Sequence, residues 1–202
     1  MYSLNTAASL PEDTRQRIHA ALEELKSKQV IERIWKGDHT VWKPDPTEIS
    51  NRLGWLHCVE TMRPLLEGIQ EFAEGVLADG YTDAVLLGMG GSSLAPEVFS
   101  RTMGTKEGAL RLRVADTTDP GALLAIQRQI NPDRALFIVA TKSGGTVETL
   151  SGFKFFYNWI TDQPGGGDAG QHFIAITDPG SSLVDLAGKY SFRHVFLNDP
   201  NI

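Results

Sequence analysis

The sequence has little cysteine and no long apolar run, and each lack excludes a class of protein. Cys58 is the only cysteine among the 202 residues, so the chain cannot form an internal disulfide. No apolar run approaches the ~20 residues that a membrane-spanning helix needs, and no secretory signal opens the sequence. We therefore expect a cytoplasmic protein with no membrane partner.

Basic charge is also scarce. The chain has 19 Lys and Arg against 25 Asp and Glu, a formal net charge of -6, which disfavours nucleic acid as a partner. Any anion must then be bound by a local site. No second histidine or cysteine stands at ligand spacing from His57 and Cys58, so we expect no metal site. With 41% hydrophobic and 22% charged residues, the chain can bury a full core.

Residues 1–80 are predicted to form a helical N-terminal flank packed on the main domain. Residues 10–28 have the spacing of an amphipathic helix. Residues 31–46 suggest an irregular strap anchored by Trp35 and Trp42. After it comes a long apolar face at helical spacing, interrupted near Pro64 and near Gly68.

Residues 81–202 have the alternation of an α/β domain. The expected strands are 84–87, 110–115, 135–140, 173–177 and 195–197. The expected helices between them are 93–103, 120–129, 146–160 and 182–189. Short apolar strands joined by helical crossovers predict a five-stranded, parallel, doubly wound sheet with helices on both faces.

Two glycine turns stand at the ends of expected strands. Residues 88–93 read Gly-Met-Gly-Gly-Ser-Ser and residues 141–146 read Thr-Lys-Ser-Gly-Gly-Thr. Ligands of open α/β sheets bind at the carboxyl ends of the strands, where backbone N–H groups and helix N-termini favour anions. The residues expected to hold a phosphate are Gly90, Gly91, Ser92, Thr141, Lys142, Ser143 and Thr146.

Other interpretations of these turns remain open. Their hydroxyls and glycines are also typical of helix caps and tight turns. A dinucleotide site is a further alternative, since Gly88-x-Gly90 follows a strand and Asp116 ends the next one, although Ser93 stands at the third glycine position. Asp116 is better explained as a turn cap. No Gly-x-x-x-x-Gly-Lys-Ser/Thr motif occurs, and we expect no cofactor.

The two turns together resemble the sugar isomerase (SIS) domain of the glucose-6-phosphate isomerase family. The matching segments are Gly88-Met89-Gly90-Gly91-Ser92-Ser93-Leu94-Ala95-Pro96, Thr141 to Thr149, Asp116 to Pro120 and Phe196 to Ile202. The resemblance implies a flavodoxin-like SIS sheet. It also implies that the candidate phosphate-binding residues of the two glycine turns bind the phosphate group of a sugar phosphate. The family commonly has a hydroxyl residue at Gly145. The segment Trp35 to Trp42 is similar to the isomerase half of bacterial transaldolase/glucose-6-phosphate isomerase fusions.

The resemblance also implies a reaction and a division of labour. Family members interconvert glucose 6-phosphate and fructose 6-phosphate by cis-enediol proton transfer, commonly as homodimers. In the family the base, an arginine, a histidine and a lysine lie beyond the point that matches Ile202. We therefore expect a phosphosugar-binding part without a catalytic residue, with Glu148 complementing a helix N-terminus. The alternative is a non-catalytic sugar-phosphate-sensing SIS module of a regulator.

Overall fold

The computed structural model describes residues 10–164 and 166–202 and divides into two compact units. One unit is Met1–Cys58 together with Asn201–Ile202, and the other is Val59–Pro200. The second unit contains the whole sheet and both glycine turns, so the candidate site lies within one unit.

Short helices make up the described part of the first unit. They are α1 (Glu12–Ser27), α2 (Val30–Trp35) and the 3-10 turns η2 (His39–Val41), η3 (Ser50–Arg52) and η4 (Gly54–His57). Helix α1 confirms the predicted amphipathic helix. It begins directly after Pro11, with Glu12 and Asp13 in the first turn, where acidic side chains suit the helix dipole.

The segment predicted as an irregular strap is partly helical. Gln29 takes a left-handed conformation with φ of 50°, which ends the preceding helical run and lets α2 begin at Val30. After α2, the Asp38 carboxylate accepts hydrogen bonds from the Thr40 N–H at 2.9 Å and from Arg33 Nε at 2.7 Å. The Trp35 and Trp42 side chains stay about half exposed, at 56% and 48%. The packing of this segment on the main domain stays a prediction.

The long apolar face is not one helix, because the turns η3 and η4 precede α3 and a further break follows it. Helix α3 (Cys58–Met62) passes into the turn η5 (Arg63–Leu65) at Pro64, whose ring cannot supply the N–H that a continuous helix needs. Helix α4 (Leu66–Ala78) then runs through Gly68 without interruption. The kink at Pro64 is thus confirmed, and the one expected near Gly68 is wrong because a single glycine weakens a helix without ending it.

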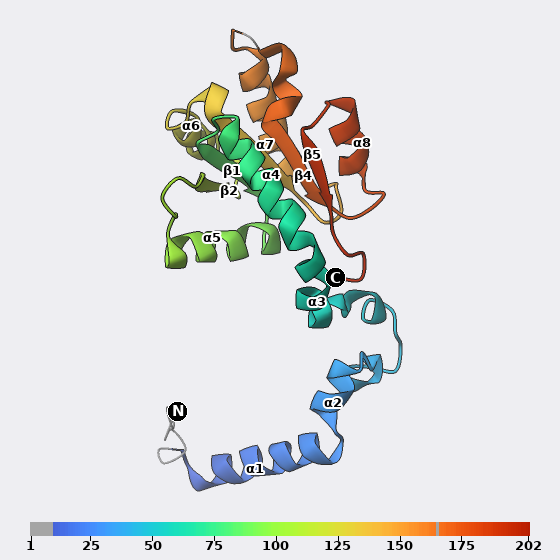
Figure 1. The fold of residues 1–202 in the computed structure, drawn as a ribbon. Helices are drawn as coiled ribbons and strands as arrows, with labels where there is room; N and C mark the ends of the chain where they lie inside the picture. Colours follow the sequence, from blue (N-terminus) through green and yellow to red (C-terminus); the bar gives the residue numbers. More distant parts are fainter. Residues whose placement is uncertain (1–9, 165) are drawn as a thin grey trace. The chain divides into compact units, whose positions relative to one another are not determined.

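The second unit is an α/β domain built on a five-stranded parallel sheet (Figure 1). Its strands are β1 (Asp83–Gly88), β2 (Arg111–Ala115), β3 (Ala135–Ala140), β4 (Phe173–Thr177) and β5 (His194–Leu197). The strand order is β2-β1-β3-β4-β5, and every neighbouring pair is parallel. The connecting helices are α5 (Gly91–Met103), α6 (Pro120–Gln127), α7 (Val147–Thr161) and α8 (Ser182–Lys189), with short turns η6 (Pro132–Arg134) and η7 (Gly166–His172). The predicted fold class is confirmed.

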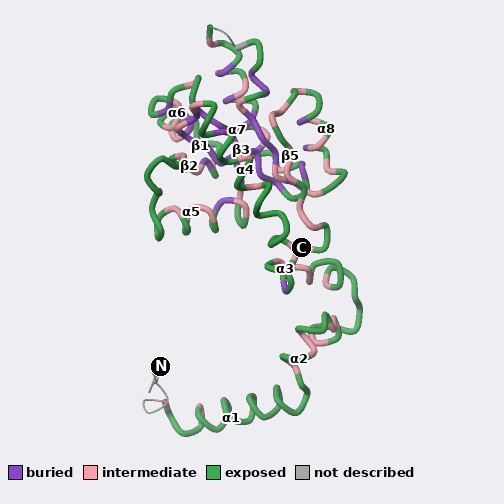
Figure 2. Tube along the Cα trace, viewed as in Figure 1, coloured by how far each residue is buried: buried purple, intermediate pink, exposed green. Residues whose placement is uncertain are grey.

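Each face of the sheet buries apolar side chains. Figure 2 shows that buried residues are concentrated along the strands. The larger core joins the sheet to α6, α7 and α8, and Phe137 at its centre stacks between Phe156 and Phe173, with ring centroids 4.8 and 4.9 Å away. A smaller core joins the other face to α4 through Val76. The sheet is therefore covered on both faces, as near-continuous apolar strands require.

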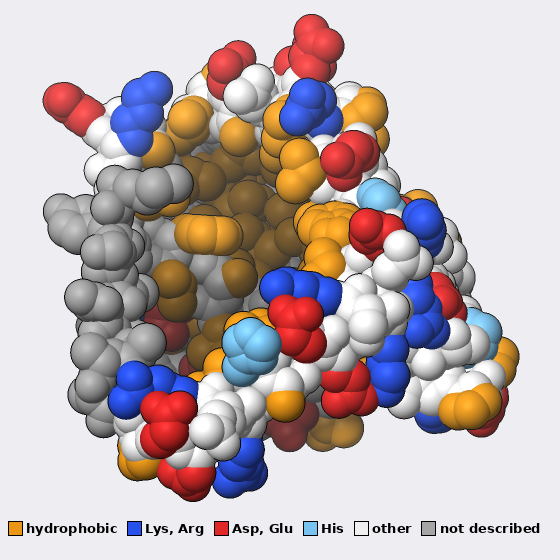
Figure 3. Space-filling view, turned by 90° about the horizontal axis from the view of Figure 1, so that it is seen from below, with side chains coloured by type: hydrophobic (Ala, Val, Ile, Leu, Met, Phe, Trp, Pro, Cys, Tyr) orange, Lys and Arg blue, Asp and Glu red, His pale blue; other side chains and the backbone are white. Residues whose placement is uncertain are grey.

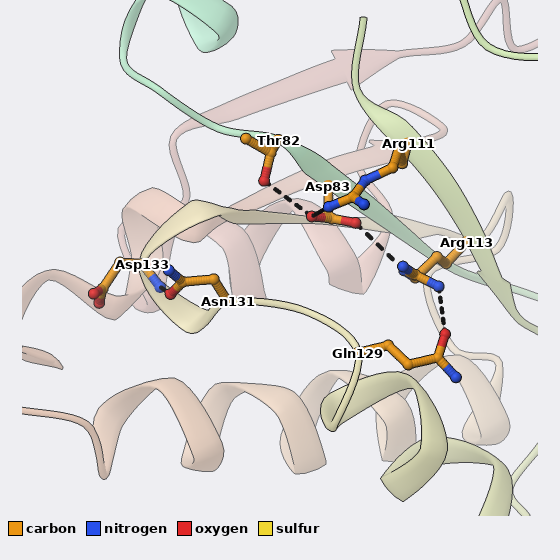
Figure 4. Close-up of polar contacts among 7 residues, drawn as sticks. All are labelled: Thr82, Asp83, Arg111, Arg113, Gln129, Asn131 and Asp133. Carbon is orange, nitrogen blue, oxygen red and sulfur yellow. Dashed lines mark hydrogen bonds and ion pairs between the residues drawn. The ribbon is translucent and has the colours of Figure 1, made fainter.

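A buried carboxylate marks the amino edge of the sheet (Figure 4). Asp83, only 1% exposed, opens β1 and accepts hydrogen bonds from Arg111 Nη2 at 2.9 Å and Thr82 Oγ1 at 2.9 Å. Arg113 Nε lies 3.4 Å from its other oxygen and Arg113 Nη1 donates to Gln129. This cluster joins β1 to β2 at the edge opposite the glycine turns, so we interpret it as structural.

Candidate functional site

The strand order brings the two glycine turns together. The chain leaves β1 for β2 on one side and returns to β3 on the other side of β1, so β1 and β3 are neighbours at the point where the order reverses. Their last residues, Gly88 and Ala140, are register partners. Residues 88–93 and 141–146 therefore start side by side at the carboxyl edge, where open α/β sheets bind their ligands.

The first turn needs glycine at two positions. A Cβ on Gly88 would lie 3.1 Å from the Ser92 Cβ and 3.2 Å from the Ala140 carbonyl oxygen. Gly90, the N-cap of α5, has φ of 55° and ψ of -121°, a conformation that side chains disfavour. Gly91 and Ser92 open α5, while Ser93 is fully buried and its hydroxyl donates to the Gly90 carbonyl at 3.0 Å. The Ser92 and Ser93 N–H groups donate to the Met89 and Gly90 carbonyls at 3.2 and 3.1 Å, so these turn bonds leave the Gly91 N–H at the start of α5 unused.

The second turn is closed by its own hydroxyls. Thr141 and Thr146 lie with their Oγ1 atoms 2.7 Å apart, and Thr141 is 4% exposed. Since one hydroxyl donates to the other, one O–H of the pair stays available to a ligand. The Ser143 hydroxyl accepts from the Gly145 N–H at 3.4 Å. The pair fixes the turn and keeps one donor for a further group.

The loop after β4 supports this second turn. Gly144 has φ of 76°, and a Cβ there would lie 2.8 Å from the Leu183 backbone nitrogen and 2.9 Å from the Ser181 Cβ. The Ser182 hydroxyl donates to the Gly144 carbonyl at 3.1 Å. Residues 141–146 are thus held between β1 and the start of α8, which requires glycine at position 144.

Capping separates these turns from the loop after β2. Gly90 before α5 has no side chain to cap the helix, and among the described residues Thr146 before α7 makes no side-chain cap hydrogen bond. Helix α6, in contrast, is capped by Asp119, whose carboxylate accepts from the Ala122 N–H at 2.7 Å. The start of α6 already faces a carboxylate, whereas the Gly91 N–H of α5 and the first N–H groups of α7 remain for an anion.

In the loop after β2 the helix cap is Asp119, and the turn cap expected of Asp116 stays a prediction. Asp119 caps α6, and the Thr117 hydroxyl accepts from the Asp119 N–H at 3.0 Å. The sequence alone could not separate these two aspartates, since both stand between a strand and a helix. The position at the N-cap decides, because the side chain of that residue reaches forward to the N–H groups of the first turn.

Lys142 has a partner that the sequence did not reveal. Its Nζ lies 2.9 Å from Asp178 Oδ2, and the Asp178 Oδ1 accepts from Asn198 Nδ2 at 3.1 Å. These residues follow β3, β4 and β5 respectively, so three neighbouring strand ends contribute to the same site. Only the pairing of the strands brings them together.

Two residues near the start of α7 complete the description. Glu148 is exposed in the first turn, where a carboxylate complements the helix dipole. Thr149 is 2% exposed, and its Oγ1 has no hydrogen-bond partner among the described residues. Spacing gave no signal for Thr149, because a buried hydroxyl on a helix looks in sequence like any other helical position.

Other features of the described residues do not compete with this site. A hollow of about 750 Å³ lies between α4 and the sheet, lined by apolar side chains such as Phe72 and Ile138, with His194 and Asn198 as its polar members. That lining offers too few donors for a phosphate. Within residues 10–164 and 166–202 no group of three or more His, Cys, Asp or Glu is placed to hold a metal ion.

Charge is mixed on the surface. On the face drawn in Figure 3, acidic and basic side chains lie interspersed, with hydrophobic side chains exposed between them. In the described part of the chain, no helix is both long and apolar enough to cross a bilayer.

Comparison with known proteins agrees with the geometry. The sequence matches the phosphoglucose isomerase family over residues 53–187. The chain belongs to this family. It is 31% identical over 132 residues to a glucose-6-phosphate isomerase of Thermus thermophilus, covering 65% of this chain and 30% of that protein. The family resemblance drawn from the two glycine turns is thereby confirmed.

Solved structures agree on the fold. A crystal structure of glucose-6-phosphate isomerase from Chlamydia trachomatis superposes with a TM-score of 0.58 at 27% identity, over 65% of this chain and 25% of that one. A hypothetical protein of Thermus thermophilus gives a TM-score of 0.73 at 24% identity, over 91% and 41% of the two chains. This phosphoglucose isomerase family chain thus spans well under half the length of these relatives.

Proposed function

We propose that this chain binds the phosphate of a sugar phosphate between residues 88–93 and 141–146, as part of a glucose-6-phosphate isomerase. The observation that carries the proposal is the placement of both turns at the end of β1 and β3, where the strand order reverses. Residues 81–202 would then be the phosphosugar-binding domain, with residues 1–80 as its flank.

Each proposed contact follows from the local geometry. The N–H groups of Gly90 and Gly91 and the Ser92 hydroxyl would donate from the start of α5. From the second turn, the outward O–H of the Thr141–Thr146 pair and the Ser143 hydroxyl would donate to the other phosphate oxygens. Lys142 would add a positive charge at the rim.

The proposed role is binding and orientation, without proton transfer. Contacts to a phosphate remote from the reacting carbons are equal in the ground and transition states, so they place the sugar without lowering the chemical barrier. We propose no residue of this chain as the general base, because Glu148 lies exposed at a helix start that it stabilises. The acid and base groups would come from other parts of the proposed glucose-6-phosphate isomerase.

Calorimetric titration with glucose 6-phosphate tests the site. Ser143→Ala and Thr146→Ala should each weaken binding by about 1.5–3 kcal/mol, the usual worth of a hydrogen bond to a charged group. Thr146→Ser keeps the hydroxyl and should bind like the parent chain. Ser151→Ala is the matched control, since Ser151 donates within α7 to the Val147 carbonyl. Unchanged affinity in both alanine variants would refute the assignment.

An activity assay tests the proposal that this chain binds the phosphate but supplies no general base. The 202-residue chain should show no measurable conversion of fructose 6-phosphate, because positioned acid and base groups contribute about 10²–10⁴-fold each. Turnover by this chain that disappears in Glu148→Gln would make Glu148 the base and contradict the proposal.

A further inference from the structure

The pairing of Lys142 with Asp178 carries a further inference. Asp178 is held at several points: Oδ2 accepts from Lys142 Nζ at 2.9 Å, Oδ1 accepts from Asn198 Nδ2 at 3.1 Å, and its N–H donates to the Lys142 carbonyl at 3.2 Å. Asn198 is itself fixed, since its N–H donates to the Thr177 carbonyl at 2.9 Å. The Asp178 carboxylate therefore has a defined position beside the second glycine turn.

Lys142 is less restrained than its partner. Its side chain is 51% exposed, against 23% for Asp178. An ion pair this open to water contributes little to stability, and the lysine stem is flexible. Lys142 can therefore turn from Asp178 to another anion at small cost, while Asp178 cannot follow it.

We propose that Asp178 competes with a bound phosphate for the Lys142 ammonium, and thereby weakens ligand binding and speeds ligand release. This inference rests on the proposed function, because the phosphate is the competitor. The ion pair holds part of the Lys142 charge away from the site, so a phosphate must compete with Asp178 for that charge. Such an arrangement suits a phosphate-binding site. Tighter binding that is equal in the ground and transition states does not raise the turnover rate once the substrate is bound.

The test replaces the carboxylate by its uncharged isostere. Asp178→Asn keeps an oxygen that can accept from Asn198, and calorimetry with glucose 6-phosphate should show about 3- to 10-fold tighter binding. Asp178→Glu keeps the charge and should stay within about twofold of the parent chain. Asp133→Asn, on exposed Asp133 at the amino end of β3, makes the same change in net charge at the opposite edge of the sheet and should leave affinity unchanged.

A double-mutant cycle separates competition for Lys142 from a general field effect. In a Lys142→Met background, Asp178→Asn should change affinity by less than about twofold, because the group that Asp178 competes for is gone. Equal tightening in both backgrounds, or unchanged or weaker binding of the single Asp178→Asn variant, overturns the inference. Absence of binding by the parent chain overturns the proposed function and the inference with it. Binding by the parent chain without a gain in Asp178→Asn overturns the inference alone.

Discussion

Two adjacent glycines of the second turn should respond in opposite ways to the same substitution. Gly144 has φ of 76°, and a Cβ there would meet the Leu183 backbone nitrogen at 2.8 Å and the Ser181 Cβ at 2.9 Å. Gly145 has no atom within 4 Å of its would-be Cβ and no positive φ. Gly144 is thus fixed by its surroundings, whereas Gly145 is free to carry a side chain.

The expected magnitudes follow from those contacts. Gly144→Ala carries the left-handed backbone penalty of about 1–2 kcal/mol together with about 1–3 kcal/mol for the overlap, so we expect a loss of about 2–5 kcal/mol in the free energy of unfolding. The Leu183 backbone nitrogen and the Ser181 Cβ form the obstacle, and neither atom moves away when a side chain rotates. Gly145→Ala should be neutral or stabilise by about 0.4–1 kcal/mol, because it restricts only the unfolded chain.

Urea unfolding of the two variants beside the parent chain, followed by circular dichroism, measures both changes. Gly145→Thr extends the comparison, since the family commonly has a hydroxyl residue there and the space is open. The reasoning fails if Gly144→Ala is as stable as the parent chain, or if Gly145→Ala is destabilised as strongly as Gly144→Ala.

Three further predictions concern the amino edge, the first unit and cofactors. Asp83→Asn should lower the free energy of unfolding by roughly 3 kcal/mol in urea unfolding, because it leaves the partly buried Arg113 without its countercharge. Arg111→Gln changes a side chain that is 62% exposed and should alter stability by less than about 1 kcal/mol. Equal effects of the two variants would contradict this account. Hydrogen bonds from the Thr40 and Arg33 side chains lower the pKa of Asp38 from 3.8 to about 2. The stabilising contribution of Asp38 is therefore present above pH 3.8 and is lost as pH falls toward 2. An NMR titration of the Asp38 carboxyl should show the lowered pKa, and a pKa at the ordinary value of 3.8 would contradict the account. NADH and ATP should compete with glucose 6-phosphate no better than inorganic phosphate does, and micromolar NADH binding that Asp116→Ala abolishes would favour a dinucleotide site.

Much of the sheet was predictable because its signal is local. Apolar runs of three to six residues bounded by turn residues identified the strands to within one residue at each end, β3 and β4 without error. Buried parallel strands have no polar face to blur the pattern. Helix α2 was missed, because a six-residue helix among tryptophan, glycine and proline has too few turns to show a period.

The polar contacts of the site were predictable only in part. Residue types and strand ends identified the two turns, whereas the Thr141–Thr146 hydroxyl pair and the Lys142–Asp178 ion pair depend on the fold of the loop and on the pairing of β3 with β4. The Asp83 cluster at the opposite edge joins residues about thirty positions apart and gave no signal for the same reason. Spacing along the chain shows which groups are present at an edge, and the strand register decides which of them meet.

The pairing of β1 with β3 sets how the candidate site can adapt to a ligand. Every residue from Asp83 to Gly88 has a register partner in β3. The two turns therefore follow two neighbouring, hydrogen-bonded strands inside the sheet. Parallel strands keep a spacing of about 4.8 Å, and widening it would break hydrogen bonds on which the sheet depends. The distance between the two turns is therefore fixed by the sheet. Side chains such as Lys142 must adjust to the size of a bound group.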